Sequence, residues 1–372
     1  MKINIYGDLC PTKSNIGLLQ MRDYKTVFNC VCEINKQADY NIVNLECALV
    51  SKLEKTNKSG PRMTAPIECL SGIIDAGFNI LSVANNHSLD NGYDSFEQEL
   101  ERITSMGCSY VGANIKDGCC DYLIRGKGKE STAIIAVSDH EYNTDEDGYG
   151  VCVFSESSTY SRILELKKEV PYVVVIYHSG FENAVYPSPG LMKRCRAMAD
   201  FGADVVLCQH SHCIGAFEKY NKSLILYGQG NFLFDLTDRL SWHCGLCVSL
   251  EITENGIVNR FVPLVVKDGC IAIDHKMENH ILQEFNSRSE EILNQDFIKQ
   301  KWKELLISET WKYNAMLRGG SKFDYVAGKI FEKTIPKLWL GKKRLATYLL
   351  FLRSDTHREA LSNLLEMERR KY

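Results

Sequence analysis

The sequence has no apolar run as long as the roughly 20 residues that a membrane-spanning helix requires. It also has no N-terminal targeting segment, because residues 2–6 already have the composition of a strand and contain neither a long apolar stretch nor a small-residue cleavage site. These absences argue against an integral membrane protein and against a secreted one. We therefore expect a cytoplasmic protein, and one C-terminal segment, described below, leaves a membrane-peripheral location open.

Charge of one sign is not in excess. The 44 Lys and Arg residues nearly balance the 47 Asp and Glu residues, giving a formal net charge of -3 and a pI of about 6.3. Proteins that bind nucleic acid usually carry a strongly basic surface, and this composition provides none globally. We expect no nucleic-acid partner.

A disulfide framework is missing although cysteine is abundant. The 15 cysteines are odd in number and scattered, without regular spacing. Cys244 and Cys247 form the single C-x-x-C pair, which predicts strand packing rather than zinc because no second pair accompanies it. We expect reduced thiols that fill core positions, as is usual in the cytosol.

The order of predicted elements indicates an α/β fold. Strands and helices alternate through the first half of the chain, and residues 214–273 then form strands joined by turns, including a hairpin turn at 254–256. Helices are expected over 24–36, 67–76, 93–106, 159–168 and 189–201. The main strands are expected over 3–6, 41–46, 78–84, 109–113, 132–137, 172–178 and 204–209. We predict a main domain over residues 1–275 and a helical C-terminal region over 276–372.

Polar side chains follow the apolar strands at the points where they end. Four of the nine histidines come directly after apolar runs, and these are His87, His178, His210 and His212. Asp8, Glu46 and Asn86 end or follow other strands. Because ligands of open α/β sheets bind beyond the carboxyl ends of the strands, we expect these groups to converge.

Imidazoles and carboxylates together are typical ligands of divalent metal ions. Imidazole suits zinc, iron or manganese, and a carboxylate can bridge two cations. We therefore expect two metal ions, Mn, Zn or Fe, and metal-assisted hydrolysis at phosphorus or carbon. One imidazole should remain outside the metals, and His87, next to a ligand asparagine, is the candidate for catalysis.

The motifs also resemble a known family in their order along residues 1–270. They are Gly7-Asp8, Asn44-Leu45-Glu46, the run from Ala84 to Gly92, His178-Ser-Gly-Phe-Glu182, the run from Gly202 to His212, and Tyr227-Gly-Gln-Gly-Asn231-Phe232. This order is similar to that of the CapA family of capsule and poly-γ-glutamate biosynthesis proteins. The resemblance implies a calcineurin-like metallophosphatase fold, a four-layer α/β/β/α sandwich, followed here by a C-terminal helical region.

The resemblance also implies roles for individual residues. The implied metal ligands are Asp8, Glu46, Asn86, His178, His210 and His212. In this arrangement Glu46 takes the place of a bridging aspartate and His87 is the catalytic imidazole. Glu182 and Asn231 belong to the matched motifs and are expected to bind substrate or to support the ligands, and Asn85 is expected to support the loop. Arg62 lies outside these motifs. Its guanidinium could bind an anionic group, and a solvated loop arginine is the alternative.

The sequence departs from the metallophosphatase pattern at two positions. The usual Asp-x-His is Asp8-Leu9-Cys10 here, so one ligand of the first metal is missing or replaced by a thiolate. Gln209 stands where a glycine usually precedes the His-x-His pair. The first metal site is therefore expected to be weakened.

Residues 336–353 mix aromatic and aliphatic side chains with lysine and arginine. This pattern is typical of a helix packed on its own domain, and it also suits a helix that docks on a membrane surface or on a partner protein. Both interpretations stay open.

The leading functional hypothesis is a metal-dependent hydrolase, acting on a phosphoester in capsule or other cell-surface polymer biosynthesis. Its substrate would be a small molecule or a polymer precursor. One alternative is a non-catalytic accessory protein that binds the polymer or its precursor. Another is an amide or ester hydrolase or transferase acting on a glutamyl-type substrate.

Overall fold

The computed structural model describes residues 1–56, 60–115, 121–141, 143–144, 148–309 and 311–313, together with Val326 and Tyr348. The chain divides into two compact units, Met1–Trp302 and Lys303–Tyr372. The first, here called the N-terminal unit, contains all the strands described below. None of the helices formed by the described residues has the length and hydropathy needed to cross a bilayer.

The first sheet of the N-terminal unit has eight strands in the order β18-β17-β16-β1-β2-β5-β6, with β15 also paired to β1. Strands β1, β2, β5 and β6 are parallel, whereas β16, β17 and β18 continue the sheet as antiparallel strands. The bounds are β1 (Lys2–Leu9), β2 (Tyr40–Leu45), β5 (Ile80–Ser82), β6 (Ser109–Val111), β15 (Asn231–Leu233), β16 (Cys244–Thr253), β17 (Gly256–Lys267) and β18 (Cys270–Ala272).

The second sheet has six strands in the order β13-β14-β12-β11-β9-β8. Its centre is parallel, and antiparallel strands close both edges. The bounds are β8 (Asp121–Ile124), β9 (Thr132–Ser138), β11 (Tyr172–His178), β12 (Val205–Gln209), β13 (Phe217–Tyr220) and β14 (Ser223–Leu226). Two small ribbons pair β3 (Ala48–Val50) with β4 (Thr64–Pro66) and β7 (Ala113–Asn114) with β10 (Gly150–Val151).

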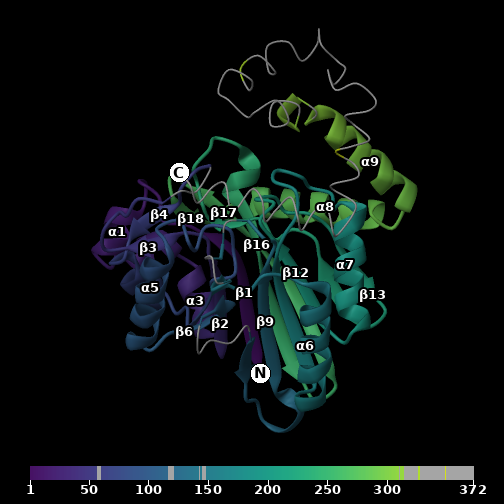
Figure 1. Ribbon diagram of the computed structural model, residues 1–372, viewed down its shortest axis with the longest axis horizontal. Helices are drawn as coiled ribbons and strands as arrows, with labels where there is room; N and C mark the ends of the chain where they lie inside the picture. The colour runs from purple at the N-terminus through teal and green to yellow at the C-terminus, as the bar shows by residue number, and fades with distance from the viewer. Residues whose placement is uncertain are drawn as a thin grey trace. The chain divides into compact units, whose positions relative to one another are not determined.

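Helices cover the outer faces of both sheets, as Figure 1 shows for α3 and α5 on one side and for α6 and α7 on the other. The α-helices are α1 (Ile16–Gln20), α2 (Tyr24–Phe28), α3 (Val31–Lys36), α4 (Cys69–Asp75), α5 (Tyr93–Ser105), α6 (Glu156–Glu169), α7 (Pro189–Asp200), α8 (His275–Glu291) and α9 (Gln295–Ser308). Short 3-10 turns are η1 (Gly128–Glu130) and η2 (Leu240–His243).

The alternation of side chains along β11 shows how the layers form. Val174 and Ile176 join the core that also holds the first sheet, whereas Val173 and Val175 join the core under α6 and α7. Successive strand residues point to opposite faces, so both faces of this strand are buried. The predicted α/β fold with helices, two sheets and helices in four layers is confirmed.

Some predicted boundaries were wrong. The expected helix over 24–36 is two helices, α2 and α3, because Asn29 has a φ of 44° and ends the first one. Residues other than glycine rarely adopt a positive φ, and the spacing of hydrophobic residues cannot reveal this break. Strand β5 is shorter than the expected 78–84, strand β8 was not predicted, and the expected strand over 109–113 is split between β6 and β7.

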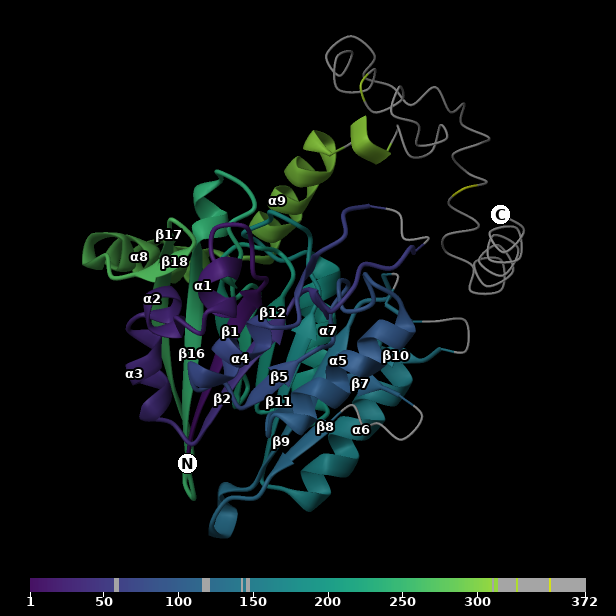
Figure 2. The same ribbon diagram turned by 90° about the vertical axis from the view of Figure 1, so that its left-hand side faces the viewer.

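The first C-terminal helices pack on the sheets. Ile281 and Phe285 of α8 belong to the core of the first sheet, and Figure 2 shows α8 beside β17 and β18. The compact N-terminal unit accordingly runs to Trp302, beyond the boundary at residue 275 that was drawn from the sequence. Of the segment 336–353, only Tyr348 is among the described residues, so both interpretations of that segment stay predictions.

The cysteines follow the prediction with one exception. Among the cysteines that the structure describes, twelve are free thiols, and most of these are buried, including Cys244 and Cys247 within β16. Cys152 is disulfide-bonded, so the expectation that all the thiols are reduced was wrong. Spacing along the chain could not reveal this bond, because pairing depends on three-dimensional proximity.

Glu99 gives a test of the packing around α5. Its carboxylate is buried, accepts a hydrogen bond from the Leu49 N–H at 3.0 Å, and has a pKa raised by burial to about 8. A carboxyl whose folded-state pKa is raised contributes stability that is complete below its ordinary pKa and is lost as the pH rises through 8. We expect Glu99→Gln to flatten the decrease in unfolding free energy between pH 5 and pH 8, measured by urea denaturation, whereas Glu101→Gln on the exposed face of α5 should not. Equal pH dependence in wild type and Glu99→Gln would contradict the assignment.

Candidate metal centre

The ends of β1 and β2 place two carboxylates and an amide side by side. Asp8 pairs in register with Asn44, and a register irregularity lies between Tyr6 and Asp8. Gly7 occupies that irregularity, where a Cβ would lie 2.1 Å from the Gly230 carbonyl oxygen, so only glycine fits. Asn44 donates to Asp8 Oδ1 at 2.8 Å, and Glu46 follows two residues later. Asp8, Asn44 and Glu46 are fully buried.

The loop after β5 carries Asn85, Asn86 and His87. Asn85 is completely buried and uses its side chain within the protein, donating to Asn44 Oδ1 and to the Leu45 carbonyl and accepting from the His87 N–H. It therefore shapes the loop. Asn86 and His87 are 8% and 7% exposed, which places them nearer solvent than the carboxylates.

Strands β11 and β12 deliver three histidines from the second sheet. His178 is the last residue of β11, and His210 and His212 follow β12. His210 and His212 have φ values of 91° and 53°, and residues other than glycine rarely adopt such positive values. Such strain costs on the order of 1–3 kcal/mol per residue and is concentrated at functional sites. The His210 N–H also faces Asp8 Oδ2 at 3.3 Å.

Gln209, the departure from the expected glycine, joins the two sheets directly beneath this turn. Its amide donates to the Tyr6 carbonyl of β1 at 3.1 Å and to Gln229 Oε1 at 3.0 Å. Gln229 in turn donates to the Ile5 and Leu246 carbonyls. This substitution therefore fixes β12 against β1, where the candidate ligands meet.

The predicted ligands meet in two groups that share one carboxylate. Ligand atoms of Glu46, His178 and His210 lie within 4.8 Å of one another, and so do those of Asp8, Glu46 and His212. Glu46 Oε1 is 3.4 Å from His178 Nε2, and Glu46 Oε2 is 3.9 Å from His212 Nδ1. Asn86 joins the first group, because its Oδ1 lies 3.1 Å from His178 Nε2.

Glu46 provides the clearest indication that a cation binds in this centre. Neither of its buried carboxylate oxygens has a hydrogen-bond partner among the described residues. Burial and the nearby charge of Asp8 raise the pKa of Glu46 well above its usual range. An unsatisfied buried carboxylate is costly, and a bound cation supplies the missing partner. The donor set therefore fits one or two divalent ions.

The histidines divide into two electrostatic kinds. Burial lowers the pKa of His178 and of His210 to about 4, so both imidazoles are neutral and keep a lone pair for a metal. At His212, burial is outweighed by the charge of Glu46 and by the interactions with Asp8, and the pKa is about 9. At Asp8, burial is outweighed by the hydrogen bonds with His212 and Asn44, and the pKa is about 2.

His87 stands beside the ligands rather than among them. Its Nδ1 lies 2.7 Å from Asp90 Oδ2, and this contact fixes the orientation of the ring. Arg62 holds this loop by donating to the Asp90 carbonyl at 2.8 Å and to Asn91 Oδ1 at 3.0 Å. Arg62 thus positions the catalytic candidate, and Asp90 is a site residue that the strand-end pattern did not identify.

The remaining candidates lie on the side of His212 and at the surface. Asn231 Oδ1 is 2.9 Å from His212 Nδ1, and the Trp242 ring packs against the His212 ring at an interplanar angle of 33° with centroids 4.1 Å apart. Glu182 is exposed, and its charge raises the pKa of Glu46. No sequence signal pointed to Trp242, since it lies outside every strand-end pattern. Asn44 could have been found, as a polar residue near the end of an apolar strand.

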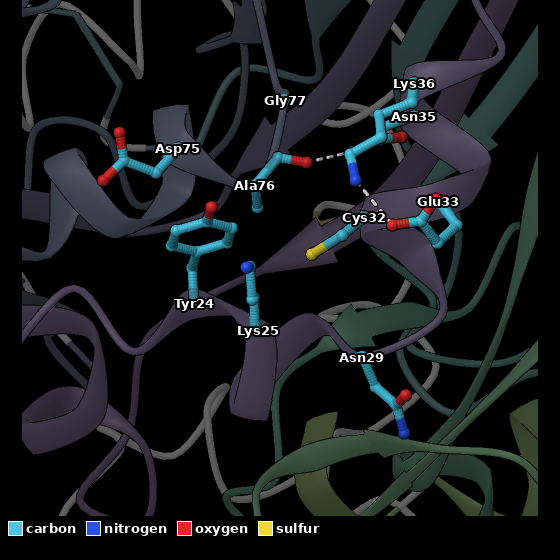
Figure 3. A pocket seen from close by; sticks show the side chains of 10 residues that line it. All are labelled: Tyr24, Lys25, Asn29, Cys32, Glu33, Asn35, Lys36, Asp75, Ala76 and Gly77. Atoms are coloured by element: carbon cyan, nitrogen blue, oxygen red, sulfur yellow. Dashed lines mark hydrogen bonds and ion pairs between the residues drawn. The ribbon is translucent and has the colours of Figure 1, made fainter.

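A pocket lined by residues of α2, α3 and α4 does not belong to the centre. It has a volume of about 370 Å³ and is lined by Tyr24, Lys25, Asp75 and neighbouring residues, as Figure 3 shows. Asn35 at its wall donates to the Ala76 carbonyl at 2.9 Å and accepts from the Tyr6 hydroxyl at 2.6 Å. None of the strand-end ligands lines it, so it is separate from the metal chemistry.

Residues 2–236 match the family model of the bacterial capsule synthesis protein PGA_cap. The chain belongs to this family. The matched region includes every candidate ligand, and it ends shortly before Trp242 and α8. The resemblance inferred from the motifs is confirmed.

Two curated relatives agree with this assignment. The chain is 26% identical over 250 residues to the PGA biosynthesis protein CapA of Bacillus subtilis (strain 168), covering 63% of this chain and 66% of that protein. It is 27% identical over 256 residues to the capsule biosynthesis protein CapA of Bacillus anthracis, covering 65% of this chain and 62% of that protein. The chain thus spans less than two thirds of the length of either relative.

Solved structures show more distant similarity. The 5'-nucleotidase of Candida albicans SC5314 is 12% identical with a TM-score of 0.43, covering 82% of this chain and 59% of that chain. The protein TT1561 of Thermus thermophilus is 10% identical with a TM-score of 0.40, covering 70% of this chain and 98% of that chain.

The unsatisfied carboxylate of Glu46 generates a prediction about stability. In metal-free protein at pH 8, Glu46→Gln should raise the melting temperature by a few degrees, because an amide cannot ionise and so avoids the cost of a carboxyl group whose pKa burial and Asp8 raise. Adding Mn²⁺ should raise the melting temperature of the wild type more than that of Glu46→Gln, because the variant loses a shared ligand. Differential scanning fluorimetry after chelation measures both effects. Glu99→Gln, a substitution of a buried carboxyl group outside the centre, is the matched control for the Mn²⁺ shift and should show the same shift as the wild type. Equal Mn²⁺ shifts in wild type and Glu46→Gln would argue against the site.

Proposed function

We propose that this protein is a metal-dependent hydrolase that cleaves a phosphoester in the synthesis of a bacterial capsule or another cell-surface polymer. One observation carries the proposal: two groups of buried ligands share Glu46, whose two oxygens face different histidines. Paired metal ions suit hydrolysis at phosphorus, since together they stabilise the attacking and leaving oxygens. Membership of the capsule synthesis family supports the polymer context.

In this proposal the candidate ligands form two metal sites, which are called the two halves of the centre. Asp8, Glu46 and His212 would hold one ion, and Glu46, Asn86, His178 and His210 would hold the other. When bound, the ions would acidify a water molecule and neutralise charge on the transferred group. Asn44 fixes the Asp8 carboxylate at 2.8 Å and lies 3.3 Å from His178 Nδ1, so it orients a ligand in each half.

His87 is the proton-transfer group in this proposal. Asp90 holds its Nδ1, and Arg62 and the Met63 N–H hold Asp90 and its loop in turn. The imidazole is therefore held in a fixed orientation beside the candidate ligands, and we propose that it donates a proton to the leaving oxygen. Its small residual exposure, 7%, places it at the entrance rather than beneath the carboxylates.

A paired substitution tests the function. Protein loaded with Mn²⁺, Zn²⁺ or Fe²⁺ should hydrolyse members of a phosphoester panel that includes sugar phosphates and polymer precursors. His87→Ala should lower kcat by about 10²–10⁴-fold without changing the metal content, because the ring is not among the metal ligands. His140→Ala is the matched control, since His140 also follows a strand but is exposed. Unchanged kcat in His87→Ala would refute the role of this imidazole.

The products decide between reaction types. Release of inorganic phosphate or of a phosphorylated fragment supports phosphoester hydrolysis. Release of glutamate or a glutamyl fragment from a glutamyl-type substrate supports amide or ester chemistry instead, which similar ions also promote. Tight binding of a precursor without turnover in any metal form would favour the accessory role.

A further inference from the structure

We propose that Asn231 is a metal ligand and supplies the donor that the first metal site lacks at Cys10. The inference rests on the proposed metal-dependent function and extends it. It gives the half of the centre formed by Asp8, Glu46 and His212 a fourth protein donor. The site is then complete despite the departure from the Asp-x-His pattern.

Asn231 Oδ1 is one of three side-chain oxygens that face His212 Nδ1. His212 Nδ1 is 2.9 Å from Asn231 Oδ1, 3.5 Å from Asp8 Oδ2 and 3.9 Å from Glu46 Oε2. Oxygen and nitrogen ligands bound to one ion at about 2.1 Å are themselves roughly 3–3.4 Å apart. The separations around His212 therefore suit a common ion after small adjustments.

The other half of the centre has the same construction. His178 Nε2 is 3.1 Å from Asn86 Oδ1, 3.1 Å from His210 Nδ1 and 3.4 Å from Glu46 Oε1. In each half, one imidazole nitrogen thus faces an asparagine oxygen, an oxygen of Glu46 and one further donor. Asn231 occupies in the first half the place that Asn86 occupies in the second.

The amide of Asn231 is oriented by its surroundings. Its Nδ2 donates to the Phe234 carbonyl at 3.2 Å and to the Trp242 carbonyl at 3.1 Å. Carbonyl oxygens accept hydrogen bonds only, so these two contacts identify the nitrogen and leave Oδ1 as the atom that faces the centre. With His212 Nδ1 bound to an ion, Oδ1 would no longer receive a proton from that ring and would be available as a donor.

The backbone of Asn231 is held next to Asp8. Strand β15 pairs with β1 so that Asn231 is in register with Asp8. Gly245 of β16 lies so close that a Cβ there would be 1.9 Å from the Asn231 carbonyl oxygen. A fully buried residue fixed from both sides can present its side chain without an entropic cost on metal binding.

Cys10 does not replace the missing histidine in this geometry. Its thiol donates to the Pro11 carbonyl, with Sγ 3.7 Å from the oxygen. Among the described residues, neither group of candidate ligands includes Cys10. The thiolate ligand considered from the sequence is therefore less favoured than Asn231.

Metal binding by two variants tests the inference. Wild type, Asn231→Ala and Cys10→Ser are stripped with chelator, reloaded with Mn²⁺ or Co²⁺, and compared by elemental analysis and chelator competition. We expect Cys10→Ser to match the wild type and Asn231→Ala to lose one ion or to bind it more than about 100-fold more weakly, a loss beyond the roughly 10–100-fold that removal of a supporting group causes. Unchanged metal number and affinity in Asn231→Ala, or loss of an ion in Cys10→Ser, would overturn the proposal.

A spectroscopic readout covers the case in which Asn231→Ala does not fold. The Co²⁺-loaded wild type should show d–d bands without the near-ultraviolet thiolate-to-cobalt charge-transfer band, whereas that band would identify Cys10 as the ligand and refute the inference. Activity separates this proposal from the hydrolase proposal. Metal binding that depends on Asn231 without any turnover would refute only the hydrolase, and turnover with Asn231-independent metal binding would refute only the ligand.

Discussion

Two carboxylates are buried against each other at the end of the first sheet, where their negative charges would repel. The groups around them compensate for this repulsion. Asp8 and Glu46 are fully buried, and the charge of Asp8 contributes to the raised pKa of Glu46. Isolated charges are expensive in a protein interior unless cations or hydrogen bonds compensate for them. The histidines of the second sheet, the amide of Asn44 and the inferred metal ions all supply such compensation.

This constraint explains why the two sheets must be held in a fixed relation. Each half of the centre takes Glu46 from the first sheet and a histidine from the second, so sliding of one sheet over the other would separate the ligands. Gln209 and Gln229 join the sheets by hydrogen bonds to main-chain carbonyls close to the ligands. Polar contacts of this kind specify a register that apolar packing alone leaves less defined.

Much of the fold and the membership of the centre could be predicted from the sequence. Apolar runs that end in polar residues identified His178, Glu46 and the others, since parallel strands place their carboxyl ends at one edge. What depends on long-range geometry could not be predicted. The disulfide at Cys152 and the contact of Trp242 with His212 require knowledge of which distant segments meet, and the positive φ at Asn29 leaves no mark in the hydrophobic pattern. In the sequence, Gln209 stood out only because it replaces the usual glycine, and its hydrogen bonds between the two sheets could not be predicted.

The turn that holds His210 and His212 has a further consequence for the size of ion that the centre accepts. The two imidazoles belong to different halves, yet only Ser211 separates them, and both have left-handed backbone conformations. The spacing between the halves is therefore set largely by the main chain rather than by side-chain rotamers. A main chain held in a sparsely allowed conformation resists adjustment. An ion whose radius does not match this spacing should therefore strain the turn, because the main chain cannot adjust as readily as a side chain.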